Sequence, residues 1–356
     1  MSENKYTDEF FKEYEQRYMR STPTQKPDPV KTQKPNNKFT KNRILVATVA
    51  FVVILAITVG IILITGPNKN DVADGVNNVV STVEKPKVKP LPEFNENTVE
   101  LGSKIVSEHA ILINVTDNTV VASKNSDARI YPASLTKILT LLVAVENIEN
   151  FDDTFEMTYE ITDPPYKAGA SMAGFLSGEV ITIKDLLYGA ILPSGAEATA
   201  AIAIYVSGSE AEFAKLMNAK AKELGITTAH FTNTSGLHND NHYCTVMDMA
   251  VILSAAMKNE MCREILSTYQ YTTTATPQHP EGILLTCTLF GRMKGDEPEG
   301  AEILGGKTGF TSEAGNCIAS FGVSESGKEY IFVTTKAKGL WKAVYDHIDT
   351  YTAYAK

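Results

Sequence analysis

The sequence predicts a mixed α/β domain of the α+β type, preceded by one transmembrane helix. In this domain helices flank an antiparallel sheet, and a helical subdomain is inserted between its strands. Three observations support this fold class. An uncharged apolar run occupies residues 44–65, strand patterns occur near both ends of residues 97–356, and helical patterns fill the region between them. Because both ends of residues 97–356 are strand-like, we expect them to pair in one sheet that the helices cover.

The composition excludes several classes of protein. Of the 356 residues, 43% are hydrophobic, which is enough for a large core and argues against wholesale disorder. The 23 glycines and 4 cysteines are ordinary for this length, which excludes a collagen-like or disulfide-dense scaffold. A formal net charge of -9 argues against nucleic acid as a partner, because phosphate binding requires a basic surface.

The transmembrane prediction rests on residues 44–65, which carry no charge over 22 positions. A helix of about 20 apolar residues crosses the hydrocarbon layer of a bilayer. A buried core helix fits the run less well than a transmembrane helix does, because buried helices seldom run this long without a polar face. A cleaved signal peptide is the better rival, but 43 residues precede the run and no small-x-small cleavage site follows it.

Flanking charges predict the orientation of this helix. Six basic residues occupy the twenty positions before it and two occupy the twenty after it. The positive-inside rule therefore places the N-terminus in the cytoplasm and the large C-terminal region outside, as in a single-pass signal anchor of the cell membrane. The predicted segments are a cytoplasmic tail, the anchor, a proline-containing extracytoplasmic stalk and an outer domain, at 1–43, 44–65, 66–96 and 97–356.

Within the outer domain, turn and periodicity signals predict the order of elements. Residues 110–114 and 119–122 flank a Thr-Asp-Asn turn, which predicts a hairpin, and residues 318–323 and 330–335 predict a second one. Helical periodicity predicts helices between the hairpins and one after them, at 134–146, 183–192, 196–206, 210–224, 245–257 and 340–354.

The first chemical motif is Ser134-x-x-Lys137 at the start of a predicted helix, where residues three apart project to one side. A serine hydroxyl becomes a nucleophile when a base takes its proton, and a lysine can be that base if its pKa is lowered. The helix N-terminus also offers backbone N–H groups that can hold an oxyanion. By itself the motif is weak, because it occurs by chance in many chains and is better explained as a helix cap followed by a solvated lysine.

Two further motifs lie later in the chain. The sequence Lys307-Thr308-Gly309 offers a cation, a hydroxyl and a residue without Cβ. On an edge strand these can hold a carboxylate and let a peptide pair as an added strand, although a plain turn is the alternative. Ser194 lies between two predicted helices, where it can relay a proton between the two lysines or simply cap the next helix.

Taken together, the order of these motifs resembles the active-site serine penicillin-recognising enzymes. The surrounding residues narrow the resemblance to the D-alanyl-D-alanine carboxypeptidases, which are low-molecular-mass penicillin-binding proteins, over about residues 100–350. The stretches that carry it are Tyr131–Lys137, Asp185–Gly189, Phe231–Leu237, His242-Tyr243 and Gly305–Thr311. The resemblance implies a penicillin-binding protein/β-lactamase-like fold for the outer domain.

The resemblance also implies catalytic roles. Ser134 would be the nucleophile that forms an acyl-enzyme, Lys137 its general base, and Ser194 the relay that passes a proton toward the leaving group. The reaction would release the terminal D-alanine of a peptidoglycan stem peptide, without a cofactor or metal. β-Lactams would acylate the same serine and act as covalent inhibitors.

Substrate-binding roles follow from the same resemblance. Lys307 and Thr308 would place the terminal carboxylate of the peptide, and Gly309 would allow its backbone to approach. The backbone N–H of Phe310, together with that of Ser134, would form the oxyanion hole.

One position departs from the family pattern. The middle motif of the family usually reads S-x-N, whereas here Ser194 is followed two positions later by Ala196. Losing an amide contact of this kind is worth about 1–3 kcal/mol, or roughly a ten- to hundredfold lower rate. Either a neighbour such as Asn316 substitutes, or the enzyme is slow, or the domain is a catalytically inactive relative that binds peptidoglycan.

Other functions receive less support. A serine β-lactamase would share the fold, but no glutamate in an E-x-x-L-N setting follows the middle motif. His238 and His242 are four apart but lack the glutamate of a zinc peptidase motif, which favours a loop over a metal site. No two of the four cysteines form a C-x-x-C pair. The sequence does not decide whether they form disulfides or stay free thiols.

Overall fold

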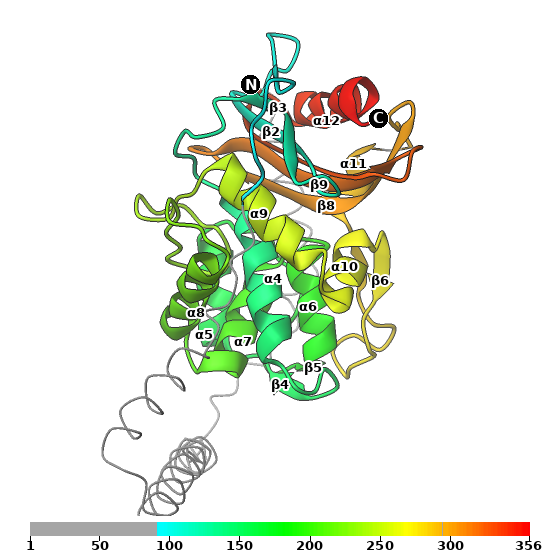
Figure 1. The fold of residues 1–356 in the computed structure, drawn as a ribbon. Helices are drawn as coiled ribbons and strands as arrows, with labels where there is room; N and C mark the ends of the chain where they lie inside the picture. The colour runs from blue at the N-terminus through cyan, green and yellow to red at the C-terminus, as the bar shows by residue number, and fades with distance from the viewer. Residues whose placement is uncertain (1–90, 294) are drawn as a thin grey trace, which may run out of the picture. The chain divides into compact units, whose positions relative to one another are not determined.

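The computed structural model describes residues 91–293 and 295–356 (Figure 1). The predicted cytoplasmic tail, the transmembrane helix at 44–65 and most of the predicted stalk lie outside these residues and stay predictions. Within the described ranges, no helix is both long and apolar enough to cross a membrane.

A six-stranded sheet, in the order β1-β3-β2-β10-β9-β8, is the frame of the domain. Neighbouring strands run antiparallel, except β1 and β3, which are parallel. The strands are β1 (Val99–Glu100), β2 (His109–Asn114), β3 (Thr119–Lys124), β8 (Ala301–Thr311), β9 (Gly315–Ser324) and β10 (Glu329–Ala337). Every residue of β2 pairs with β10, so the two ends of the domain meet in one sheet as the sequence predicted.

Both predicted hairpins are confirmed as β2–β3 and β9–β10. In the first turn, the side chain of Asn114 accepts a hydrogen bond from the N–H of Asp117 at 2.9 Å. Asparagine favours turns for this reason, because its side chain replaces a backbone acceptor. The last residues of the predicted stalk also contact this hairpin, since the N–H of Glu93 donates to Asn118 O and its own carbonyl accepts from Val120 N–H.

The predicted helices are confirmed, with ends that differ by at most two residues. They are α4 (Thr136–Asn147), α6 (Ile183–Ile191), α7 (Ala196–Ser207), α8 (Glu210–Glu223), α9 (Val246–Ala256) and α12 (Leu340–Tyr354). α4 lies at the centre of the helical subdomain, where it contacts α6, α7, α8, α9 and α10 (Glu260–Ser267). Ten of its twelve residues are buried, which explains why its sequence shows little polar face.

Helices cover both faces of the sheet. α12 packs on β9 and β10, whereas α9 packs on β2 and β10 from the side that also holds α4 (Figure 1). The turn that precedes α4 contacts β9 and β8, which are the last two strands in the sheet order. The sheet edge and the helical subdomain therefore meet near Ser134.

Several short elements were not predicted. They are α5 (Tyr159–Lys167), α10, α11 (Thr288–Met293) and the two-stranded pairs β4 (Thr154–Glu156) with β5 (Val180–Thr182) and β6 (Gln270–Thr272) with β7 (Leu284–Thr286). α5 contains Pro164 and Pro165, and proline normally argues against a helix interior. The three-residue strands are too short to give a periodic signal.

The four cysteines, whose state the sequence left open, are buried free thiols in the structure. They lie in the cores of the sheet and the helical subdomain and pack as small apolar side chains. Burial raises the pKa of Cys317 to about 12, so this thiol remains protonated at neutral pH.

A buried carboxylate joins α12 to the loop that follows β1. Asp346 accepts hydrogen bonds from the N–H groups of Val106 and Ser107, at 2.9 and 2.8 Å, and from the Ser107 hydroxyl at 2.6 Å. We expect Asp346→Ala to lower the free energy of unfolding by about 2–4 kcal/mol, because these buried donors lose their acceptor. Urea unfolding measures this change.

The matched control is Asp349→Ala, which removes an exposed carboxylate from the same helix. Its free energy of unfolding should stay within about 0.5 kcal/mol of the unsubstituted protein. Equal effects of the two substitutions would contradict this account of Asp346.

Candidate active site

Ser134 lies in a single 3-10 turn, η1 (Ala133–Leu135), that leads directly into α4 and contacts β8 and β9. The preceding residue, Ala133, has a φ of +47°, which is unusual for a residue with a side chain. Strained backbone of this kind persists only where the surroundings hold it, and it is common at functional sites. The turn leaves the Ser134 side chain half-buried at the junction between the sheet and the helices.

The backbone around this turn fits only because two neighbours are glycines. Gly236 has a φ of +81°, and a Cβ there would lie 1.8 Å from the carbonyl oxygen of Ala133. A Cβ on Gly309 would lie 2.9 Å from the backbone nitrogen of Ser134. The strand β8 thus approaches the serine backbone directly, a contact that the sequence did not predict.

Lys137 directs its amine at the serine. Its Nζ lies 3.2 Å from Ser134 Oγ and donates to the carbonyl oxygen of Ser235 at 2.7 Å. The residue is 2% exposed, and burial lowers the pKa of Lys137 to about 7, while the nearby Glu197 and Glu210 raise it. A large fraction of this amine is therefore unprotonated at neutral pH and able to accept a proton.

Lys307 extends from the edge strand β8 into the same interior. It is 1% exposed, and its Nζ donates to the carbonyl oxygen of Thr308 at 2.9 Å. Burial holds the pKa of Lys307 well below its ordinary value, and repulsion from Lys137 and Arg292 lowers it further. The two lysines thus influence each other electrostatically. The hydroxyl of Thr308 lies 2.7 Å from that of Thr288 on α11.

Ser194 occupies the loop between α6 and α7 in a left-handed conformation, with a φ of +70°. It is buried, and its hydroxyl has no hydrogen-bond partner among the residues that the structure describes. The N-cap of α7 is Gly195 and not Ser194, so the capping alternative does not hold. Among the described residues, no hydrogen bond joins Ser194 to Lys137 or Lys307.

The remaining predicted residues are placed as follows. The side chain of Phe310 is 62% exposed at the end of β8. Asn316, suggested as a substitute for the missing asparagine, donates its side-chain N–H to Ala337 O at 3.1 Å. Its side chain forms no hydrogen bond with a motif side chain in the described part of the chain, so hydrogen bonding gives this suggestion no support.

Three supports of the site were not predicted from the sequence. The carbonyl of Ser235 holds Lys137, while the neighbouring carbonyl of Thr234 accepts from the Thr140 hydroxyl on α4 at 2.8 Å. The carboxylate of Glu210 in turn binds the N–H and hydroxyl of Thr234. The family resemblance included residues 231–237 but assigned no role to any of them. The contacts of this segment with α4 span nearly a hundred positions and leave no periodic signal.

His242 supports the start of α4 through its ring nitrogens. Its Nδ1 accepts from the N–H of Thr232 at 3.1 Å, so Nε2 carries the proton and lies 2.8 Å from Thr136 Oγ1. Burial, and repulsion from two nearby histidines, lower the pKa of His242 to about 4, which keeps the ring neutral. Since both ring nitrogens are used, the metal alternative for His238 and His242 has no basis.

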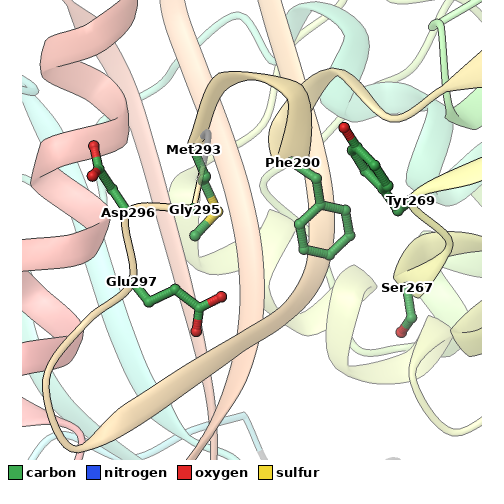
Figure 2. A pocket seen from close by; sticks show the side chains of 7 residues that line it. All are labelled: Ser267, Tyr269, Phe290, Met293, Gly295, Asp296 and Glu297. Carbon is green, nitrogen blue, oxygen red and sulfur yellow. The ribbon is translucent and has the colours of Figure 1, made fainter.

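A hollow of about 440 Å³ lies beside α11 and the end of α10 (Figure 2). Its lining includes the rings of Tyr269 and Phe290, whose centroids are 6.1 Å apart in an edge-to-face arrangement. None of the predicted site residues lines it. The hollow is therefore separate from the group formed by Ser134, Lys137 and Lys307.

The close approach of β8 to Ser134 generates a prediction. We expect Gly309→Ala to slow acylation of Ser134 by a fluorescent penicillin by about tenfold or more, because the new methyl group displaces the turn that carries the serine. Rapid-quench labelling of the full-length protein in detergent measures the rate. Gly102→Ala, where a Cβ meets nothing within 4 Å, should leave the rate unchanged. An unchanged rate for Gly309→Ala would contradict the approach described here.

The family model and the similar proteins found by comparison all point to the same family. Residues 95–339 match the family model for D-alanyl-D-alanine carboxypeptidase. The chain is 32% identical over 225 residues to D-alanyl-D-alanine carboxypeptidase DacF of Bacillus subtilis, covering 63% of this chain and 56% of that protein. It is also 32% identical over 221 residues to a D-alanyl-D-alanine carboxypeptidase of Streptomyces sp. (strain K15), covering 60% and 75%. The chain thus spans little more than half the length of the Bacillus relative.

Solved structures agree with this result. The crystal structure of the Streptomyces K15 DD-transpeptidase superposes with a TM-score of 0.62 at 28% identity, covering 70% of this chain and 97% of that one. A D-alanyl-D-alanine carboxypeptidase from Mycobacterium tuberculosis shares the fold at 24% identity, with a TM-score of 0.60. The resemblance seen in the motifs is confirmed, and the chain belongs to the D-alanyl-D-alanine carboxypeptidase family.

Proposed function

We propose that this protein is a serine-type D-alanyl-D-alanine carboxypeptidase that removes the terminal D-alanine from peptidoglycan stem peptides through an acyl-enzyme on Ser134. One observation carries the proposal. The Lys137 amine is buried, lies 3.2 Å from Ser134 Oγ and has a pKa of about 7, so it suits a general base at neutral pH. Family membership and the matching order of motifs support the same assignment.

In the acylation step, Lys137 Nζ takes the proton of the Ser134 hydroxyl while Oγ attacks the carbonyl carbon of the penultimate D-alanine. The backbone N–H groups of Ser134 and Phe310 hold the oxyanion. The C–N bond to the terminal D-alanine breaks, and its nitrogen receives a proton that Ser194 relays. Water then attacks the acyl carbon, which releases the shortened peptide and restores the serine.

The edge position of β8 suits binding of an extended peptide. β8 is the last strand in the sheet order, so its outer edge is not paired with another strand of this sheet. A peptide laid along that edge would form backbone hydrogen bonds as an added strand. Lys307 and Thr308 would bind its terminal carboxylate, and Gly309 would let its backbone approach Ser134.

Two observations favour related activities as second candidates. Ala196 replaces the usual asparagine of the middle motif, which favours a slow enzyme or a peptidoglycan-binding relative without turnover. The similar solved structure from Streptomyces is named a DD-transpeptidase, in which an amine would replace water as the acceptor of the acyl group. A serine β-lactamase remains the weakest candidate, for want of the deacylating glutamate.

The proposed location follows from the sequence. The anchor at 44–65 would hold the protein in the cell membrane as a single-pass protein with a cytoplasmic N-terminus. The extracytoplasmic domain would then face peptidoglycan, its substrate in the cell wall.

Covalent labelling tests the function directly. We expect full-length protein in detergent to bind a fluorescent penicillin covalently, and Ser134→Ala to lose the label, because no acyl bond can form without Oγ. The unsubstituted protein should also release D-alanine from a stem pentapeptide. Label without release of D-alanine would identify a relative that only binds. Product formed only with an added amine would identify a transpeptidase. Fast nitrocefin hydrolysis would identify a β-lactamase. Equal labelling of Ser134→Ala would overturn the assignment of the nucleophile.

The pH dependence of acylation follows from the state of Lys137. With a pKa of about 7, its neutral form should predominate above neutral pH and fall to about one part in a hundred at pH 5. The penicillin acylation rate should therefore be flat at alkaline pH and about a hundredfold lower at pH 5, with a midpoint near 7. Circular dichroism at both pH values controls for unfolding. A rate independent of pH from 5 to 9 is the contrary result.

A further inference from the structure

Among the described residues, the hydroxyl of Thr308 on β8 has a single hydrogen-bond partner, which comes from outside the three sequence motifs. Thr308 Oγ1 lies 2.7 Å from Oγ1 of Thr288, the first residue of α11. Thr308 is 3% exposed, whereas Thr288 is half-buried. A buried hydroxyl needs a partner, and Thr288 supplies it from twenty positions away in the sequence.

The backbone of Thr288 is bound to the segment that leads into the middle motif. Its N–H donates to the carbonyl oxygen of Leu192 at 3.1 Å. Leu192 is the C-cap of α6 and stands two positions before Ser194 in the chain. Thr288 therefore joins this segment to the edge strand that carries Thr308, and its own hydroxyl is held in place by both contacts.

The backbone of Thr308 is held from its own sheet. Its carbonyl accepts from Lys307 Nζ at 2.9 Å, and the residue pairs with Ile318 of β9. What remains to be fixed is the direction in which the Thr308 hydroxyl donates. Each threonine hydroxyl has one proton to donate. The two hydroxyls share one hydrogen bond, so one of their two protons is left for a ligand.

A carboxylate bound at Thr308 requires one of the two possible directions. An ionised carboxylate only accepts hydrogen bonds, so Thr308 must donate its proton to the anion. Thr308 Oγ1 can then accept the proton of Thr288 across the 2.7 Å contact. In the reverse direction, Thr308 would donate to Thr288 and would turn its lone pairs toward the anion, which is unfavourable.

We propose that Thr288 is a positioning residue for the terminal carboxylate of the substrate: it donates to Thr308 Oγ1 and thereby directs the Thr308 O–H at that carboxylate. This inference rests on the proposed function and deepens it. No covalent bond forms or breaks in this role. Thr288 acts through Thr308, so only ligands with an anionic carboxylate should depend on its hydroxyl.

A pair of ligands that differ only in this charge isolates the role. Benzylpenicillin carries its carboxylate in the place of the terminal carboxylate of the peptide, and its methyl ester is neutral there. Thr288→Val keeps the side-chain shape and the backbone N–H but removes the donor. We expect it to slow acylation by benzylpenicillin about tenfold and to leave acylation by the ester unchanged. Thr288→Ser should recover the rate, because it restores the hydroxyl. Equal slowing with both ligands would show a merely structural role and would overturn the proposal.

The matched control is Thr286→Val. Thr286 lies two positions earlier, and its hydroxyl accepts from Gln270 Nε2 at 3.2 Å. Both acylation rates should stay as in the unsubstituted protein. Thr308→Val should lose the preference for the acid, and adding Thr288→Val to it should cause no further loss, because Thr288 acts through Thr308. A further tenfold loss in the double variant would show that Thr288 acts independently of Thr308, and the proposal would be wrong.

Equilibrium binding separates failure of this inference from failure of the proposed function. Full-length Ser134→Ala in detergent cannot be acylated, so it can be titrated with a stem peptide ending in D-alanyl-D-alanine and with the C-terminal amide of that peptide. We expect tighter binding of the acid, and Thr288→Val in this background should weaken binding of the acid about tenfold and of the amide not at all. An unchanged preference for the acid contradicts the inference, whether or not the unsubstituted protein turns over. A lost preference, together with no penicillin label on the unsubstituted protein, would remove only the proposed reaction.

Discussion

Burial of the Lys137 amine is the interaction on which the site depends. An ammonium ion is strongly hydrated, and removing it from water favours its neutral form. The structure buries Lys137, which is 2% exposed, and its amine bonds to the carbonyl of Ser235 in the loop after α8. The environment thus favours the unprotonated form of this lysine near neutral pH, and its amine lies 3.2 Å from the Ser134 hydroxyl oxygen.

The fold creates this environment by joining distant parts of the chain. β2 from one end of the domain pairs with β10 from the other, and the sheet then continues through β9 to β8. The turn that carries Ser134 rests on β8 and β9, and Gly236 and Gly309 leave room for its backbone. Positive φ values at Ala133 and Ser194 add local strain in the same region. Stability of the sheet and the helical subdomain is what maintains that strain.

The elements that the sequence predicted are those with long periodic patterns or clear turn signals. α12 has the predicted bounds, both hairpins are present, and Lys307 lies on an edge strand as expected. The elements missed were short or, as in α5, contained prolines whose helical conformation only tertiary packing explains. Ser134 and Lys137 could be paired from their spacing of three residues. The carbonyl of Ser235 could not be paired with Lys137, because this contact depends on how separate elements pack.

The direct test is the titration of Lys137 itself. In protein labelled with [13C]lysine, the Cε resonance of Lys137, assigned by its loss in Lys137→Met, can be followed by NMR from pH 5 to pH 11. A midpoint near 7 is the result that burial beside Ser134 requires. A midpoint near 10.5, the ordinary lysine value, would mean that the amine is solvated, and the proposed base catalysis would have no physical foundation.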